Sequence, residues 1–166
     1  KYVALHDAYL SVAEALTHAG IANQTAVKLS WVNAEDISDE TAADKLGQYD
    51  GIILPGGYGD RGAEGIIAAA KYAREHRVPC LMIGYGMQLA TVEAVRSLLG
   101  MPGAHSAEAS HTCDPAVVRI PADRVTALND SRQAARMGAS AVRLAPGQLH
   151  DIYGADVIRE RHGNRF

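Results

Sequence analysis

Continuously apolar runs alternate with helix-like segments along the first hundred residues of the chain. Residues 51–54 and 78–83 are nearly unbroken apolar runs, and segments with helical periodicity follow them at 63–75 and 87–99. Strands that are apolar at every position are buried on both faces, which is typical of parallel sheets covered by helices. The pattern therefore predicts an α/β fold with a mostly parallel central sheet and helices on both faces.

Weaker patterns add to this framework. Apolar spacing predicts a helix over 9–18, and Gly20 is placed to cap its end. After Gly100 the pattern weakens, and we expect an antiparallel or irregular addition to the same sheet and a polar, helical stretch at 125–136. Further strands are predicted at 3–5, 26–32, 116–120, 141–144 and 156–161.

The composition indicates a single globular domain over residues 1–166. Hydrophobic residues make up 48% of the chain and charged residues 21%, which argues against disorder. A net charge of −3 predicts no nucleic-acid surface, and no apolar run approaches the roughly 18 residues of a membrane span. No signal peptide is visible, so we expect a cytoplasmic protein, and both ends of the sequence look truncated.

A glycine-rich loop follows the first apolar run. In open parallel sheets, ligands bind beyond the carboxyl ends of the strands, and residues 54–62 lie there with the sequence Leu-Pro-Gly-Gly-Tyr-Gly-Asp-Arg-Gly. Backbone N–H groups exposed at the start of a helix can hold an anion or an oxyanion. A tight strand-to-helix turn without a ligand explains the glycines equally well, and both interpretations stay open.

A second turn, at residues 83–88, follows the second apolar run. A short strand, a sharp turn and a helix form the geometry of a nucleophile elbow, which points its central residue over the edge of the sheet. That central residue is Gly84, which has no side chain. Taken alone, these residues favour an ordinary glycine turn.

Together these segments resemble the class I glutamine amidotransferase domain of CTP synthases. The opening resembles the family's Gly-Lys-Tyr-Val-x-Leu-x-Asp-Ala-Tyr-x-Ser, residues 50–65 follow its oxyanion-loop region almost residue for residue, and residues 79–88 follow its elbow. The likeness is dense over residues 1–90 and sparse over 100–155. The segments that carry it are 1–12, 31–35, 50–65, 79–88, 106–108 and 160–166.

The resemblance implies a flavodoxin-like fold and a known chemistry. In that family a cysteine thiolate attacks the side-chain amide of L-glutamine, a histidine acts as base and acid, and a glutamate orients it. The ammonia passes to a synthase domain, in cis or in trans, that aminates UTP to CTP in pyrimidine biosynthesis. ATP and magnesium are implied for that synthase domain, whereas this domain is expected to hold no cofactor and no metal. A homo-oligomer is one option for the assembly.

Individual site residues also follow from the resemblance. Gly56, Gly57 and the N–H of Tyr85 match the oxyanion hole, in which backbone donors stabilise the tetrahedral intermediate. Gln88, Glu108 and Arg165 match positions that contact glutamine, with Glu108 accepting from the α-amino group and Arg165 pairing with the α-carboxylate. A solvated loop acid at Glu108 and an ordinary surface arginine at Arg165 are the alternatives.

The chain departs from the family where the chemistry is done. Gly84 stands at the position of the catalytic cysteine, Met82 and Tyr85 replace the family's glycine and leucine, and His-Pro-Glu does not occur in the sequence. A deliberate substitution, natural loss of activity and a modified cysteine recorded as glycine would each explain Gly84. Cys80 is expected to be a buried thiol that cannot replace the nucleophile.

Three functions therefore remain open. The first is a working glutaminase domain of a CTP synthase. The second is a pseudo-amidotransferase that serves as a glutamine-binding, regulatory or scaffold module. The third is another class I relative, such as a peptidase or chaperone homologue, against which the absence of a nucleophile at Gly84 counts equally.

Overall fold

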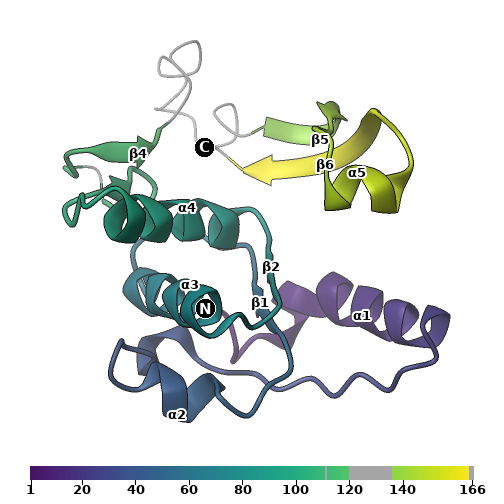
Figure 1. Ribbon diagram of the computed structural model, residues 1–166, viewed down its shortest axis with the longest axis horizontal. Coiled ribbons are helices and arrows are strands. Elements are labelled where there is room, and N and C mark those ends of the chain that lie inside the picture. Colours follow the sequence, from purple (N-terminus) through teal and green to yellow (C-terminus); the bar gives the residue numbers. More distant parts are fainter. Residues whose placement is uncertain (111, 120–135, 165–166) are drawn as a thin grey trace. The chain divides into compact units, whose positions relative to one another are not determined.

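The computed structural model describes residues 1–110, 112–119 and 136–164, and these divide into two compact units. Unit 1 comprises Lys1–Arg119 and unit 2 comprises Ile120–Phe166 (Figure 1). The expectation of a single domain stays a prediction. Among the described residues, no helix has both the length and the hydrophobicity that crossing a membrane requires.

Two strand–helix repeats form the centre of unit 1. Strand β1 (Ile52–Leu54) pairs in parallel with β2 (Cys80–Met82), with Ile52 opposite Cys80. Helix α3 (Ala63–His76) follows β1, and α4 (Tyr85–Leu98) follows β2. Both repeats were predicted from the apolar runs, and both are confirmed.

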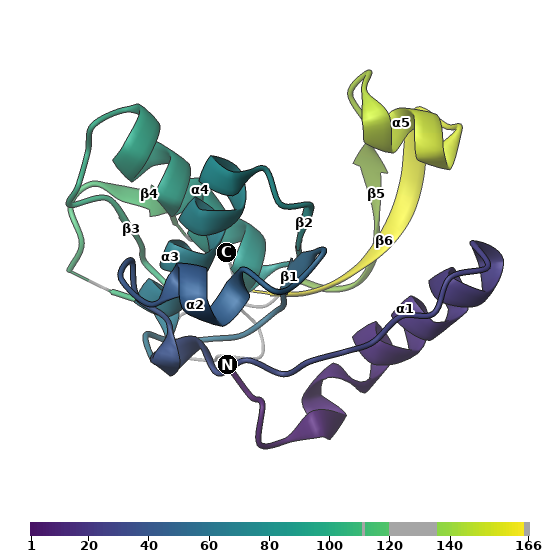
Figure 2. The ribbon, with the colours of Figure 1, turned by 60° about the horizontal axis from the view of Figure 1, so that its bottom comes forward.

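Shorter elements complete unit 1. Strands β3 (His105–Ser106) and β4 (Ala116–Val118) form a second parallel pair, in the region where a strand was predicted at 116–120. The N-terminal part of unit 1 contains four helical elements, η1 (His6–Tyr9), α1 (Leu10–Ala22), η2 (Ala34–Asp36) and α2 (Ala42–Leu46). Of these, α1 and α2 are labelled in Figure 2.

Two expected strands are not formed. Residues 3–5 make a local turn, because the N–H of Leu5 donates to Tyr2 at 2.9 Å instead of to a neighbouring strand. Residues 26–32 alternate correctly but pair with nothing among the described residues, and Val27 and Trp31 remain 45% and 41% exposed. Alternation stabilises a strand only when one face is buried against a partner.

The sheet is consequently narrower than predicted. The described strands form three separate two-stranded sheets, parallel for β1–β2 and β3–β4, instead of one mostly parallel central sheet. Ile52 and Leu54 of β1 are buried, whereas Leu81 and Met82 of β2 are 55% and 38% exposed. Helices on both faces are therefore not seen in the described part of unit 1.

Gly20 lies inside α1 and does not cap it. The helix continues to Ala22, and the N–H of Asn23 closes it by donating to Ala19 at 3.0 Å. The segment that follows α1 passes close to Gly20 and explains why this position is glycine, because a Cβ there would lie 2.6 Å from the carbonyl oxygen of Thr25.

Unit 2 is an antiparallel hairpin with a helix in its connection. Strand β5 (Arg136–Arg143) pairs with β6 (Val157–Asn164), and α5 (Gln148–Tyr153) lies between them in the sequence. The strands predicted at 141–144 and 156–161 are confirmed. Within the described residues these two strands pair antiparallel with each other, and their addition to the central sheet stays a prediction. Most of the helical stretch expected at 125–136 falls outside the described residues.

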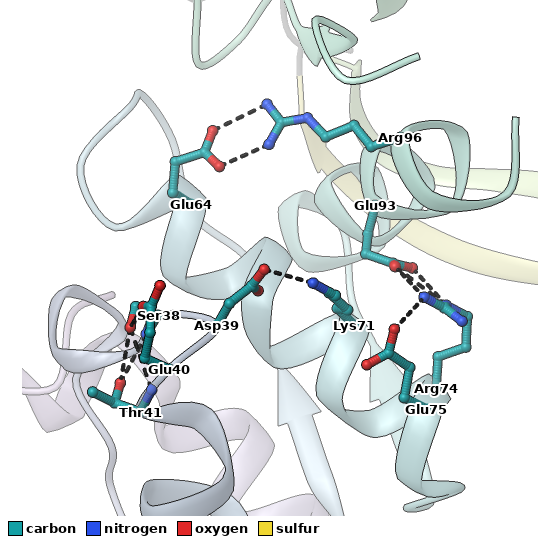
Figure 3. A network of polar contacts seen from close by, with 10 residues as sticks. All are labelled: Ser38, Asp39, Glu40, Thr41, Glu64, Lys71, Arg74, Glu75, Glu93 and Arg96. Carbon is teal, nitrogen blue, oxygen red and sulfur yellow. Dashed lines mark hydrogen bonds and ion pairs between the residues drawn. The ribbon is translucent and has the colours of Figure 1, made fainter. Parts of the chain in front are cut away.

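Two ion pairs tie α4 to α3 (Figure 3). Arg74 of α3 donates to both carboxylate oxygens of Glu93 at 2.8–3.2 Å, and Arg96 of α4 donates to both oxygens of Glu64 at 2.7 and 3.1 Å. The Glu93 side chain is only 4% exposed, whereas that of Glu64 is 66% exposed. Water screens exposed pairs, so the Arg74–Glu93 pair is the one that matters for stability.

We expect unit 1 to lose stability in acid through Glu93. Burial opposes its ionisation, yet hydrogen bonds from Arg74 and Ser97 hold the pKa of Glu93 below its ordinary value of 4.5. A carboxyl whose pKa is lowered on folding stabilises the protein fully above pH 4.5 and loses that contribution as the pH falls through the folded-state pKa. Urea unfolding between pH 7 and pH 3 measures this loss.

The variant Glu93→Gln tests the same pair. It should be less stable than wild type at pH 7 and should lose less stability on acidification. Glu75→Gln is the matched control, because the exposed Glu75 contacts the same Arg74 at 3.3 Å. If the stability of Glu93→Gln fell between pH 7 and pH 3 as much as that of wild type, the Arg74–Glu93 pair would not be the cause of the acid sensitivity.

Candidate functional site

The turn between β2 and α4 has the backbone of a nucleophile elbow. Gly84 adopts φ 51° and ψ −109°, a region that residues with side chains rarely occupy. The N–H of Gly86 closes the turn by donating to Ile83 at 2.9 Å, and the N–H of Gln88 donates to Gly84 at 3.0 Å. A Cβ built on Gly84 would meet only the Cα of Gly56, at 4.0 Å, so the position has room for a side chain.

The start of α4 lies against the end of β1. A Cβ on Gly86 would lie 2.1 Å from the carbonyl oxygen of Leu54, far inside any contact distance. The N–H of Ile83 also donates to that carbonyl, at 2.9 Å. Gly86 therefore allows the elbow to approach the strand that leads into the glycine loop.

The glycine loop, residues 55–62, lies beside the elbow as predicted. Gly59 and Gly62 adopt φ values of 70° and 72°, which glycine tolerates without strain. The hydroxyl of Tyr9 donates to the carbonyl of Gly56 at 3.0 Å and ties the loop to η1. The contact of Gly56 with the Gly84 position brings the two predicted halves of the oxyanion site together.

Three backbone N–H groups are candidates for binding an oxyanion. Within the described residues, those of Gly56, Gly57 and Tyr85 donate to no protein acceptor. An unused N–H at a helix start and in a glycine loop can serve an anionic ligand. The oxyanion role of these residues stays a prediction, and their position beside the elbow supports it.

Glu108 is buried beside the loop. Its side chain accepts from the N–H of Gly59 at 2.9 Å, and the residue is only 5% exposed. This burial excludes the solvated loop acid. Gln88, on the first turn of α4, is also 5% exposed. Contact of Glu108 and Gln88 with glutamine remains a prediction, and Arg165 lies outside the described residues.

Lys1 and the side chain of Tyr85 belong to the site, although sequence reasoning gave neither a role. Both donate to the carbonyl of Gly59, Lys1 at 2.9 Å. Burial lowers the pKa of Lys1, and the nearby Arg61 lowers it further. Burial also raises the pKa of Tyr85, with Glu108 and Asp60 adding to the effect. A tyrosine this resistant to ionisation is a poor nucleophile.

Neither Cys80 nor His6 is placed to substitute for the missing nucleophile or its base. Cys80, on β2, is half-buried, and burial raises the pKa of its thiol, which disfavours the reactive thiolate. His6 is stacked on Trp31 with ring centroids 5.3 Å apart. Over residues 1–110, 112–119 and 136–164, no three His, Cys, Asp or Glu side chains converge as metal ligands would.

Comparison with known proteins identifies the family. The sequence profile described as "Glutamine amidotransferase class-I" matches residues 4–161. The chain belongs to the class I glutamine amidotransferase family. Its α/β fold is that of the family, since the glutaminase domain of Trypanosoma brucei CTPS with bound acivicin aligns with a TM-score of 0.83. That alignment has 31% identity and covers 99% of this chain and 64% of the other.

The curated relatives of this amidotransferase are CTP synthases. The protein of Methylobacterium radiotolerans is 45% identical over 174 residues, covering 100% of this chain and 32% of the relative. The protein of Halalkalibacterium halodurans is 46% identical over 168 residues, covering 100% of this chain and 31% of the relative. The chain thus spans about a third of the length of these relatives.

Proposed function

We propose that this chain is the glutamine amidotransferase domain of a CTP synthase-type protein in which the site holds glutamine but lacks the nucleophile that hydrolyses it. One observation carries the proposal: the elbow keeps its backbone geometry at Gly84, beside the glycine loop, without a side chain. Nucleophilic catalysis needs a group that forms the covalent intermediate, and none is supplied here.

The remaining residues suit substrate binding. The N–H groups of Gly57 and Tyr85 would donate to the side-chain carbonyl of glutamine. The carboxylate of Glu108 would attract the α-amino group, since it lies at the loop and is buried, where charge interactions are strong. Gln88 would contact the substrate from α4. These contacts orient glutamine and leave its amide bond intact.

In the complete protein we expect a synthase domain, in cis or in trans, that aminates UTP with ATP and magnesium. Ammonia is the species that a glutaminase domain delivers to such a partner. With hydrolysis lost, the protein depends on free ammonia, and this domain acts as a glutamine-binding or regulatory module.

The choice of nitrogen source tests this function. The full-length protein should form CTP from UTP and ATP with ammonium, whereas glutamine should give a rate about 10⁶-fold below that of a cysteine-bearing relative, as loss of a nucleophile does in a comparable hydrolase. Formation of CTP is followed by absorbance, and glutamate release is measured in parallel.

Calorimetry with L-glutamine supplies the second half of the test. Binding with no glutamate release supports the proposal. Glutamate release at the rate of a cysteine-bearing relative contradicts the loss of hydrolysis. Absence of glutamine binding in a protein that still forms CTP from ammonium contradicts the binding role and favours a scaffold.

A further inference from the structure

Gly59 is held at both of its backbone polar groups. Its N–H donates to Glu108 at 2.9 Å, and its carbonyl accepts from Lys1 at 2.9 Å and from the hydroxyl of Tyr85. The three side chains come from the N-terminal segment, from α4 and from the residues after β3. Both peptide units that flank Gly59 are thereby fixed, at a residue whose φ of 70° glycine adopts without strain.

The groups that hold Gly59 are deeply buried. Lys1 is 6% exposed, Tyr85 is 2% exposed and Glu108 is 5% exposed. Burial of a charged side chain is costly unless the charge is hydrogen-bonded or paired. The ammonium group of Lys1 donates a hydrogen bond to the Gly59 carbonyl and makes a cation–π contact with the ring of Tyr85, whose centroid lies 5.2 Å from the ammonium nitrogen. These two interactions offset the cost of burying the charge.

Lys1 and Tyr85 also enclose Gly57. A Cβ on Gly57 would lie 3.0 Å from Cδ of Lys1 and 3.3 Å from Cδ1 of Tyr85. The pair therefore holds the loop at Gly59 by hydrogen bonds and at Gly57 by packing. Gly57 and the backbone of Tyr85 carry two of the three predicted oxyanion donors.

We propose that Tyr85, supported by Lys1, is a positioning residue that fixes the glycine loop relative to the elbow. The backbone of Tyr85 belongs to the elbow, while its hydroxyl holds the loop, so one residue links both sides of the candidate oxyanion site. The leucine found in the resembled family pattern could pack here but could not donate a hydrogen bond. The functional part of this inference, the effect on glutamine binding, rests on the proposed function. The structural part, the effect on the position of the loop, does not.

Hydrogen exchange of the loop amides in full-length Tyr85→Phe tests the structural part. The variant keeps the ring and removes the hydroxyl, so the amides of residues 56–62 should exchange about 10-fold faster, as expected for one lost hydrogen bond. The amides of α3 should keep their wild-type rates. Lys1→Met combined with Tyr85→Phe should accelerate the loop amides more than either change alone.

Tyr49→Phe is the matched control, because Tyr49 packs on the core outside the loop. Unchanged loop exchange in Tyr85→Phe, or equal acceleration in Tyr49→Phe, overturns the positioning role. Glutamine affinity measured on the same variants decides the functional part: a several-fold loss in Tyr85→Phe alone supports it, and wild-type affinity overturns it. If the wild-type protein binds no glutamine, the proposed function fails, and loop exchange alone decides whether Tyr85 positions the loop.

Discussion

Gly84→Cys in the full-length protein should raise glutamine hydrolysis by at least about 10³-fold over wild type. The elbow already has the required backbone, and a Cβ at position 84 meets nothing closer than 4.0 Å. The new thiol would stand beside the N–H groups of the loop, which are the predicted donors to the oxyanion that forms when the thiol attacks. Glutamate release at saturating glutamine measures the gain.

Gly84→Ala is the control for this gain. Alanine imposes the same unfavourable φ on a residue with a Cβ, at a cost of about 1–3 kcal/mol in stability, but it brings no nucleophile. The assay requires the full-length protein, because the His-Pro-Glu motif of the family does not occur in residues 1–166. Equal rates for the cysteine and alanine variants would show that the site lacks more than its thiol.

Gly65→Ala should destabilise unit 1 by about 4 kcal/mol or more, and the protein is expected to fold poorly. Gly65 lies on the buried face of α3, where a Cβ would stand 1.7 Å from the carbonyl oxygen of Ala34. The obstacle is backbone, which cannot move aside as a flexible side chain could. The helix would have to separate from η2, and burial of its alanine-rich face would be lost.

Urea unfolding of Gly65→Ala against Gly51→Ala measures this effect. A Cβ on Gly51 would meet its nearest neighbour, the carbonyl of Pro79, at 3.5 Å, which is an ordinary contact. Gly51→Ala should therefore stay within about 1 kcal/mol of wild type. A stable, cooperative Gly65→Ala variant would contradict the close approach of α3 and η2.

The strand–helix repeats could be predicted because local sequence determines them. The apolar runs that became β1 and β2 are short and are flanked by glycine or proline, which favours strands over helices, and the glycines after them allow the turns that follow. The elbow and loop could be located for the same reason. Their adjacency was implied by the family resemblance, in which Gly57 and Tyr85 match one oxyanion hole.

Other features depend on contacts between residues that are distant in the sequence, and the local pattern cannot predict such contacts. Residues 26–32 carry a strand pattern, but a strand forms only where a partner offers its hydrogen bonds. Lysine is ordinarily exposed, so nothing in the sequence around Lys1 indicates burial against a carbonyl 58 residues away. Tyr85 was interpreted only as a backbone donor, because the acceptor of its hydroxyl exists only in the folded loop.

The φ of Gly84 also bears on how this elbow can evolve. A cysteine at that angle stores backbone strain, whereas glycine adopts it freely, so exchanging one for the other releases stability at the moment activity is lost. Under the proposed function, this gain in stability offsets the cost of further substitutions around the elbow, so neighbouring positions tolerate more change. A cysteine that returned to position 84 would meet the same backbone strain again, so under the proposed function the glycine disfavours recovery of the nucleophile.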